Sequence, residues 1–168
     1  MKSAIVKNKY LILLITSIGV YMGYFYKSAR EIIYDYASSF MGVQEVPGES
    51  AEQSNPIIDK FLNVFGLSND EVAWCSCFVG YVMDMNGYDI SDQTPMARSW
   101  DTFGHETTEP KRGDIVVFWR ESPLSGWGHV GFLDRIEGDK IFVLGGNQSN
   151  RVKISWYPKH RLVSYRKY

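Results

Sequence analysis

The stretch VGFLDRIEGDKIFVL, residues 130–144, decides the fold class of this chain. Its two halves are short and rich in Val, Ile, Leu and Phe, and they meet at Glu137-Gly138-Asp139, which is typical of a hairpin turn. We therefore expect two antiparallel strands, over residues 130–136 and 140–144. Further runs of similar composition predict strands over residues 114–119, 151–156 and 161–165.

The chain before Gly113 has helical periodicity instead. Apolar residues recur at helical spacing over residues 27–41, and a second helix is expected to begin at Pro56 and to end at Gly66. A third helix is expected over roughly residues 73–85. Helices followed by antiparallel strands predict an α+β domain, with the helices packed on one side of a small antiparallel sheet.

Residues 10–26, with the sequence YLILLITSIGVYMGYFY, contain no charged side chain. Lysines precede this run, Lys27 follows it, and its end lacks the small residues of a signal-peptidase site. We therefore expect a single transmembrane helix that acts as an uncleaved signal anchor, although the run is short for a span. The preceding positive charges predict that residues 1–9 are cytoplasmic and that residues 27–168 form a domain outside the cytoplasm.

The charge of the chain excludes some classes of partner. Its formal net charge is −1 at pH 7, and the part after the apolar run is mildly acidic, so nucleic acid is not an expected partner. A substrate must therefore be held by a shaped site and not by bulk charge. Aromatic residues make up 15% of the chain and suit a filled core or a ring-lined groove. Both roles are open to each of the candidates Trp74, Trp100, Trp119 and Trp127.

Two cysteines lie at the start of the third predicted helix. Cys75 and Cys77 would point to nearly opposite sides of a helix, so they cannot form a disulfide with each other. A thiol at position 75 would lie at the positive end of the helix dipole, which favours the thiolate, and the first-turn N–H groups could hold an oxyanion. Cys75 is thus the predicted nucleophile, and the alternative is a small buried hydrophobic residue. For Cys77 we expect burial.

A cysteine nucleophile needs a base, and the chain contains three histidines. His129 lies between glycines at the head of a predicted strand, where we expect room for substrate and a rigid backbone to hold the ring. His105 and His160 are expected to be solvated loop residues. Asn147 follows the strand over 140–144 and could accept the second ring N–H of His129, or it could serve only a turn.

Seven short motifs occur in one order along the chain. They are Glu45-Val46-Pro47-Gly48, Ser54-Asn55-Pro56, Trp74-Cys75, Ala97-Arg98-Ser99-Trp100, Gly113-Asp114-Ile115-Val116-Val117, Gly128-His129-Val130-Gly131-Phe132 and Gly145-Gly146-Asn147-Gln148. Together they resemble the papain-like peptidoglycan hydrolases of the NlpC/P60 and CHAP group, and look closest to small bacterial and prophage members. The resemblance covers residues 29–166. Cys77 departs from the pattern, which usually has a small alanine-like residue there.

The resemblance implies a papain-like NlpC/P60 or CHAP fold and a cysteine peptidase or amidase that acts on peptidoglycan stem peptides. Such an enzyme cuts as an endopeptidase or as an N-acetylmuramoyl-L-alanine amidase, through a thioacyl intermediate. The resemblance also implies Cys75 as nucleophile, His129 as general base and Asn147 as third member of a triad. The expected location is the bacterial inner membrane, with a single pass and the catalytic domain on the periplasmic or extracytoplasmic side.

We expect no cofactor and no metal. The Asp-x-Asp calcium loop of some CHAP enzymes is not visible, and the His and Cys spacing does not match a zinc site. Two alternatives to hydrolysis stay open. One is an acyl transferase with the same cysteine and histidine chemistry, and the other is an inactive peptidoglycan-binding module. The presence of Cys75, His129 and Asn147 argues against the second, because a decayed site would be expected to have lost one of them.

Overall fold

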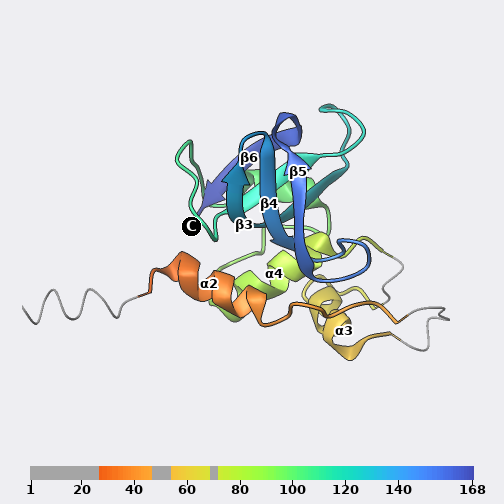
Figure 1. The fold of residues 1–168 in the computed structure, drawn as a ribbon. Coiled ribbons are helices and arrows are strands. Elements are labelled where there is room, and N and C mark those ends of the chain that lie inside the picture. Colours follow the sequence, from red (N-terminus) through yellow and green to blue (C-terminus); the bar gives the residue numbers. More distant parts are fainter. Residues whose placement is uncertain (1–26, 47–53, 69–71) are drawn as a thin grey trace, which may run out of the picture.

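The computed structural model describes residues 27–46, 54–68 and 72–168. Along the chain it contains α2 (Ala29–Ser38), α3 (Pro56–Asn63), α4 (Cys75–Met85), η1 (Ala97–Thr102), β1 (His105–Glu106), β2 (Ile115–Trp119), β3 (Gly128–Glu137), β4 (Lys140–Gly145), β5 (Lys153–Pro158), η2 (Lys159–Arg161) and β6 (Leu162–Lys167). The three α-helices lie together on one side of the strands (Figure 1). The predicted α+β class, with helices first and strands afterwards, is confirmed.

The N-terminal boundary of the described domain lies just before α2. This helix begins after Ser28, whose side chain forms a capping box with Glu31. The predicted transmembrane helix over residues 10–26 and the predicted cytoplasmic residues 1–9 lie outside the described residues. None of the helices in the described part of the chain is long and apolar enough to cross a membrane.

The strands form one antiparallel sheet in the order β1-β6-β2-β3-β4-β5. The hairpin between β3 and β4 is confirmed: Glu137 pairs with Lys140, and Gly138 has a φ of 57°, a left-handed conformation that glycine adopts without strain. The sequence patterns missed β1 and η1. A strand of two residues is too short to show alternation, and a single 3₁₀ segment has no helical stripe.

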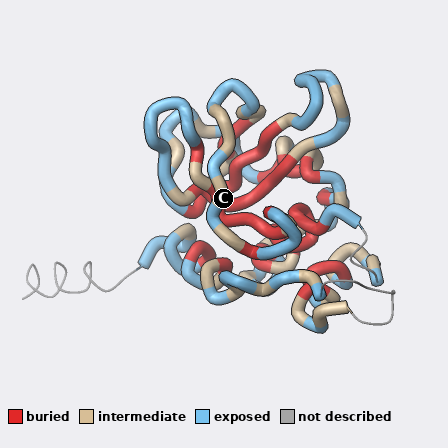
Figure 2. The backbone as a smooth tube through the Cα atoms, turned by 45° about the vertical axis from the view of Figure 1, so that its right-hand side comes forward, coloured by how far each residue is buried: buried red, intermediate tan, exposed pale blue. Residues whose placement is uncertain are grey.

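Hydrophobic side chains fill both sides of the sheet. The larger cluster lies between the helices and one face of the sheet, and it joins the rings of Phe61, Trp74, Phe78 and Phe132. A smaller cluster, which includes Phe118, occupies the opposite face. Figure 2 shows the buried backbone running through the centre of the domain and the exposed backbone in the peripheral loops. In this arrangement α4 packs directly on β3, so the start of the helix and the start of the strand are held by the same core.

Candidate active site

Cys75 is the first residue of α4, as predicted, and its backbone is held by the residue before it. Trp74 is completely buried, and its Nε1–H donates a hydrogen bond of 2.6 Å to Glu45 Oε1. Gly146 packs so closely against this ring that an added Cβ would lie 2.5 Å from Trp74 Cζ3. The first turn of α4 is thus fixed between the N-terminal segment and the turn after β4.

Burial and the start of α4 act in opposite directions on the pKa of Cys75. Its side chain is only 5% exposed, and burial raises its pKa. The backbone N–H of Val130, the Arg120 guanidinium and the N–H groups of Ser76 and Cys75 itself favour the thiolate, but burial outweighs them. The start of α4 does favour the thiolate, as expected, but burial outweighs this effect and leaves the pKa of Cys75 above its ordinary value.

Cys77 is buried in the core, as expected. Burial, with a contribution from the charge of Cys75, raises its pKa to about 12. Both cysteines are free thiols. Cys75, unlike Cys77, is the first residue of α4 and interacts with the backbone N–H of Val130 in β3.

His129 is the second residue of β3 and lies opposite Phe118 on β2. Its side chain is 1% exposed, and its ring stacks on Tyr157 with a centroid distance of 4.7 Å. Burial lowers the pKa of His129 to about 3. The positive charge of Arg120 lowers the pKa further, whereas a hydrogen bond with Gln148 raises it. The imidazole is therefore neutral at pH 7, which is the form that accepts a proton.

The glycines beside His129 have a packing role and not the expected role of leaving room for substrate. A Cβ on Gly128 would lie 2.5 Å from the carbonyl oxygen of Phe118 and 2.9 Å from Cδ of Arg98. A Cβ on Gly131 would lie 2.5 Å from a methyl group of Val143. The expectation of open space at these positions is wrong, because neighbouring strands and Arg98 already occupy it.

The side chain of Gln148 lies close to Nε2 of the His129 imidazole. A Cβ built on Gly145 would lie 3.1 Å from His129 Nε2 and 3.3 Å from Gln148 Nε2, so both groups lie against the same small volume. His129 Nε2 and Gln148 Oε1 are each buried without a hydrogen bond of ordinary length to any described residue. A side-chain interaction with Gln148 also acts on the pKa of His129 and raises it.

Asn147, the third residue predicted from the sequence, lies in the turn after β4 with a φ of 54°. Among the described residues, its side chain has no hydrogen bond to His129, whereas Gln148 Nε2 donates to the carbonyls of Val143 and Gly145. Those donations orient the amide so that Oε1 is left for another partner. In the sequence, Gln148 stands out only as part of the Gly145-Gly146-Asn147-Gln148 motif, whose two glycines indicate a close approach of the backbone.

Three observations place Cys75 and His129 in one environment. The N–H that acts on the Cys75 thiol belongs to Val130, the residue after His129. The charge of Arg120 acts on both groups. The pKa of Tyr157, which stacks on His129, is raised by burial and then by the charge of Cys75. The structure therefore brings the predicted nucleophile and base together, and adds Arg120 and Tyr157, which the sequence analysis did not identify.

The tryptophans considered as groove residues divide between the core and the surface. Trp74 and Trp100 are completely buried, so they pack the core and do not line a groove. Trp100 donates a hydrogen bond of 2.8 Å to Ser76, the residue after Cys75. Trp127 is 58% exposed, and its carbonyl accepts a hydrogen bond from the N–H of Arg120. Trp119 is partly buried.

Arg98 braces the loop between β2 and β3. Its Nη1 donates hydrogen bonds of 3.4 Å and 3.5 Å to the carbonyls of Pro123 and Ser125. Among the described residues, no group of three or more His, Cys, Asp and Glu side chains is arranged to hold a metal ion. The chemistry that this arrangement supports is proton transfer between a thiol and a neutral imidazole, followed by attack of sulfur on a carbonyl.

Comparison with known proteins finds one matching domain family, over just under half of the chain. The family model of the CHAP domain matches residues 67–147, a segment that contains Cys75, His129 and Asn147. The resemblance to the papain-like NlpC/P60 and CHAP group of peptidoglycan hydrolases, predicted from the motifs, is thereby confirmed. A search of curated proteins finds no match.

Two solved structures are similar in fold. One, from Staphylococcus aureus, is described as similar to a lipoprotein of the NLP/P60 family; it is 19% identical, with 84% of this chain and 42% of that chain covered and a TM-score of 0.46. The other is NlpC1 from Trichomonas vaginalis, at 14% identity, 83% and 44% coverage and a TM-score of 0.46. The chain spans less than half the length of either protein.

Proposed function

We propose that this chain hydrolyses amide bonds in peptidoglycan, with Cys75 as nucleophile and His129 as general base. The observation that carries the proposal is the shared environment of a helix N-terminal thiol and a neutral imidazole within a CHAP-matching segment. The bond cut is an amide of the stem peptide or the amide that joins the stem to the sugar. Cleavage of either bond by this chemistry is expected to need no cofactor.

The proposed reaction begins with transfer of the thiol proton from Cys75 to His129. Because His129 Nε2 faces Gln148, Nδ1 is the nitrogen available to the thiol. The thiolate attacks the carbonyl carbon, and the free N–H groups at the start of α4 stabilise the oxyanion. His129 then protonates the leaving amine, and water attacks the thioester to release the acid.

The partner that orients His129 is proposed to be Gln148. Its side chain lies against the same small volume as His129 Nε2, its buried Oε1 has no hydrogen-bond partner among the described residues, and its Nε2 donates to backbone carbonyls. An acceptor at Nε2 keeps the proton on that nitrogen and leaves Nδ1 free to act as a base. Asn147, adjacent in the same turn, is the alternative third residue.

A muropeptide digest tests the proposal. Full-length protein in detergent is incubated with purified muropeptides, and the products are analysed by mass spectrometry. Hydrolysis is expected to yield two fragments whose summed mass exceeds the substrate by one water. Transfer of the acyl group to an added amine, without hydrolysis products, would identify an acyl transferase instead.

A second candidate function follows from the burial of the site. Because Cys75 and His129 are 5% and 1% exposed, a substrate carbonyl reaches the thiol only after neighbouring side chains move. A domain that stays in this conformation would bind peptidoglycan without cutting it. Alkylation of Cys75 by iodoacetamide, measured with and without muropeptides, separates the two: hydrolysis predicts faster labelling when substrate analogues open the site.

The membrane anchor and the location are further parts of the proposal. Residues 10–26 are proposed to span the bacterial inner membrane once, with the CHAP-matching domain on the extracytoplasmic side. The support is the uncharged run and the lysines before it. A reporter that folds only outside the cytoplasm, fused after Tyr168, should be active; an inactive fusion beside an active cytoplasmic reporter would contradict this topology.

A further inference from the structure

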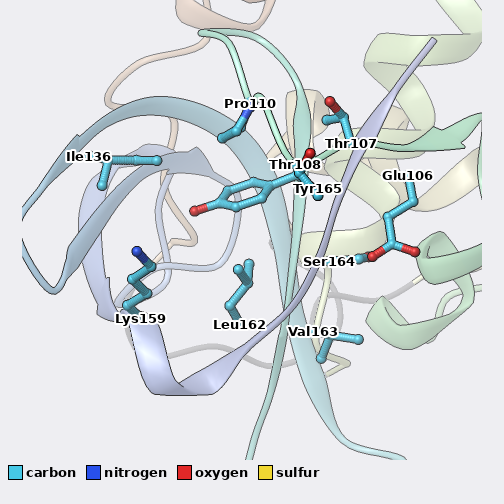
Figure 3. A pocket seen from close by; sticks show the side chains of 10 residues that line it. All are labelled: Glu106, Thr107, Thr108, Pro110, Ile136, Lys159, Leu162, Val163, Ser164 and Tyr165. Carbon is cyan, nitrogen blue, oxygen red and sulfur yellow. The ribbon is translucent and has the colours of Figure 1, made fainter.

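A hollow of about 430 Å³ lies beside β6 and is separate from the candidate active site (Figure 3). Its walls come from the segment after β1, the end of β3, η2 and β6, and none of the candidate active-site residues lines it. Pro110, Ile136 and Leu162 form apolar parts of the wall. The volume falls within the range of sites that bind small ligands, which is roughly 300–1,000 Å³.

One edge of β6 is open along this hollow. β1 pairs only with Arg166 and Lys167, and the N–H of Thr107 donates to the carbonyl of Tyr165. Residues 162–164 have β2 on one side and, in the described part of the chain, no strand on the other. Extended peptides bind to such edges through main-chain hydrogen bonds. The backbone of β6 therefore offers a place for an added strand.

The hollow contains a buried hydroxyl without a partner. Tyr165 is 8% exposed, and its Oη has no hydrogen bond to any described residue. Figure 3 shows its ring crossing the hollow, with the hydroxyl directed to the side where Lys159 and Ile136 lie. An unsatisfied buried hydroxyl is unfavourable, and a ligand that accepts its hydrogen bond would remove that cost. Burial also raises the pKa of Tyr165, so the hydroxyl remains a donor at pH 7.

The charged side chains around the hollow determine in which orientation a peptide would bind. Lys159 lies on the side of the Tyr165 hydroxyl, and Glu106 lies at the opposite end (Figure 3). An ammonium group and a hydroxyl donor at one end suit a carboxylate, and the Glu106 carboxylate would repel one at the other end. A peptide with a free carboxyl end matches this arrangement. Its carboxylate would lie at Lys159 and the Tyr165 hydroxyl, and its small apolar side chains would lie against Pro110 and Leu162.

We propose that this hollow binds the free carboxyl end of a peptidoglycan stem peptide, laid along the open edge of β6 with its carboxylate at Lys159 and the Tyr165 hydroxyl. The choice of a wall peptide rests on the proposed function. Because no candidate active-site residue lines the hollow, the inference assigns it a stem peptide other than the one being cut. Its role is then to keep the enzyme on the wall between cleavage events.

Calorimetric titration of the full-length Cys75→Ala protein in detergent tests this inference. The probe is a synthetic stem pentapeptide that ends in D-Ala–D-Ala, and the matched probe is the same peptide with an amidated carboxyl terminus. Saturable binding of the acid is expected, with a loss of about tenfold for the amide, for Lys159→Gln and for Tyr165→Phe, since each removes one charge-assisted hydrogen bond. Lys60→Gln, on the exposed side of α3, is the matched control and should bind as Cys75→Ala does.

Several outcomes would overturn the inference. Equal binding of the acid and the amide, or full binding by Lys159→Gln, would show that the carboxylate of the peptide does not bind at Lys159. Equal binding of an all-L pentapeptide would rule out a wall peptide as the specific occupant. Tyr165→Phe removes an unsatisfied group, so its melting temperature should not fall, and this separates lost binding from lost folding. Cutting by the protein with an intact Cys75 but no pentapeptide binding would refute this inference and leave the proposed function standing.

Discussion

The imidazole of His129 lies face to face with the phenol ring of Tyr157, at a centroid distance of 4.7 Å and an angle of 21° between the planes. Tyr157 also stacks on Phe118, at 4.8 Å and 25°. The proposed base is therefore part of an aromatic stack formed by β2, β3 and β5. This stack fixes the plane of the imidazole and contributes to the burial that lowers its pKa.

Removal of the Tyr157 ring should change the titration of His129. In Tyr157→Ala, water reaches the imidazole, and the pKa of His129 should rise from about 3 towards its ordinary value of 6.5. Tyr157→Phe keeps the ring and should keep the lowered pKa. NMR titration of the imidazole protons measures both. A pKa in Tyr157→Ala that stays as low as in the unaltered protein would contradict the role given to the stack.

The lowered pKa of His129 should make stability depend on pH. Between about pH 6.5 and pH 3 the unfolded chain binds a proton at this residue that the folded chain does not. The contribution of His129 to the free energy of unfolding is therefore fully present above about pH 6.5. It is lost as the pH falls, by about 3 kcal/mol between pH 7 and pH 4. Urea unfolding at both pH values measures it. The difference between the unaltered protein and His129→Gln isolates the effect, and equal pH slopes in the two would disprove it.

Gln148 and Asn147 should differ in their effect on catalysis. Gln148→Met removes the acceptor at similar volume and should lower kcat/KM by about 10- to 100-fold, since the wrong imidazole tautomer becomes accessible. Asn147→Ala should have a smaller effect. Release of amine from muropeptides measures both rates, with circular dichroism as a check on folding. If Asn147→Ala were the more damaging change, the third residue would be the one predicted from the sequence.

The two cysteines should respond differently to substitution. Cys75→Ala should reduce cleavage by at least about a thousandfold, because no other described group at the site can form the thioester. Cys77→Ala should leave cleavage within a few-fold and cost about 1 kcal/mol of stability through lost packing. Product mass spectra and thermal melts measure these effects. Cleavage that survived Cys75→Ala but not Cys77→Ala would reverse the assignment.

The fold was largely predictable because its patterns are local. The alternation after Gly113 and the helical stripes before it each lie within one element, and Glu137-Gly138-Asp139 encodes its own turn. Cys75 and His129 were also accessible from the sequence, since one depends on a helix start and the other on a strand start. β1 was not, because its two residues are held by pairing with β6 and not by their own pattern.

The surroundings of the candidate site could not be predicted, because they depend on distant contacts. Tyr157 comes from β5 and Arg120 from the end of β2, and nothing near Cys75 in the sequence indicates either. The burial of Cys75 follows from packing between α4 and β3. This burial raises the pKa of Cys75 by more than the N–H groups at the start of α4 lower it. The position of Cys75 at a helix start therefore indicates only one of the two opposing effects on its pKa.

The enclosure of Cys75 also has a chemical consequence for the lifetime of the protein. Peroxide attacks thiolates that are open to solvent, and it carries them through sulfenic acid to irreversible sulfinic and sulfonic acids. A thiol that is 5% exposed and protonated is a poor target for that damage. The protein thus protects the proposed nucleophile, Cys75, from oxidants for as long as the site stays closed.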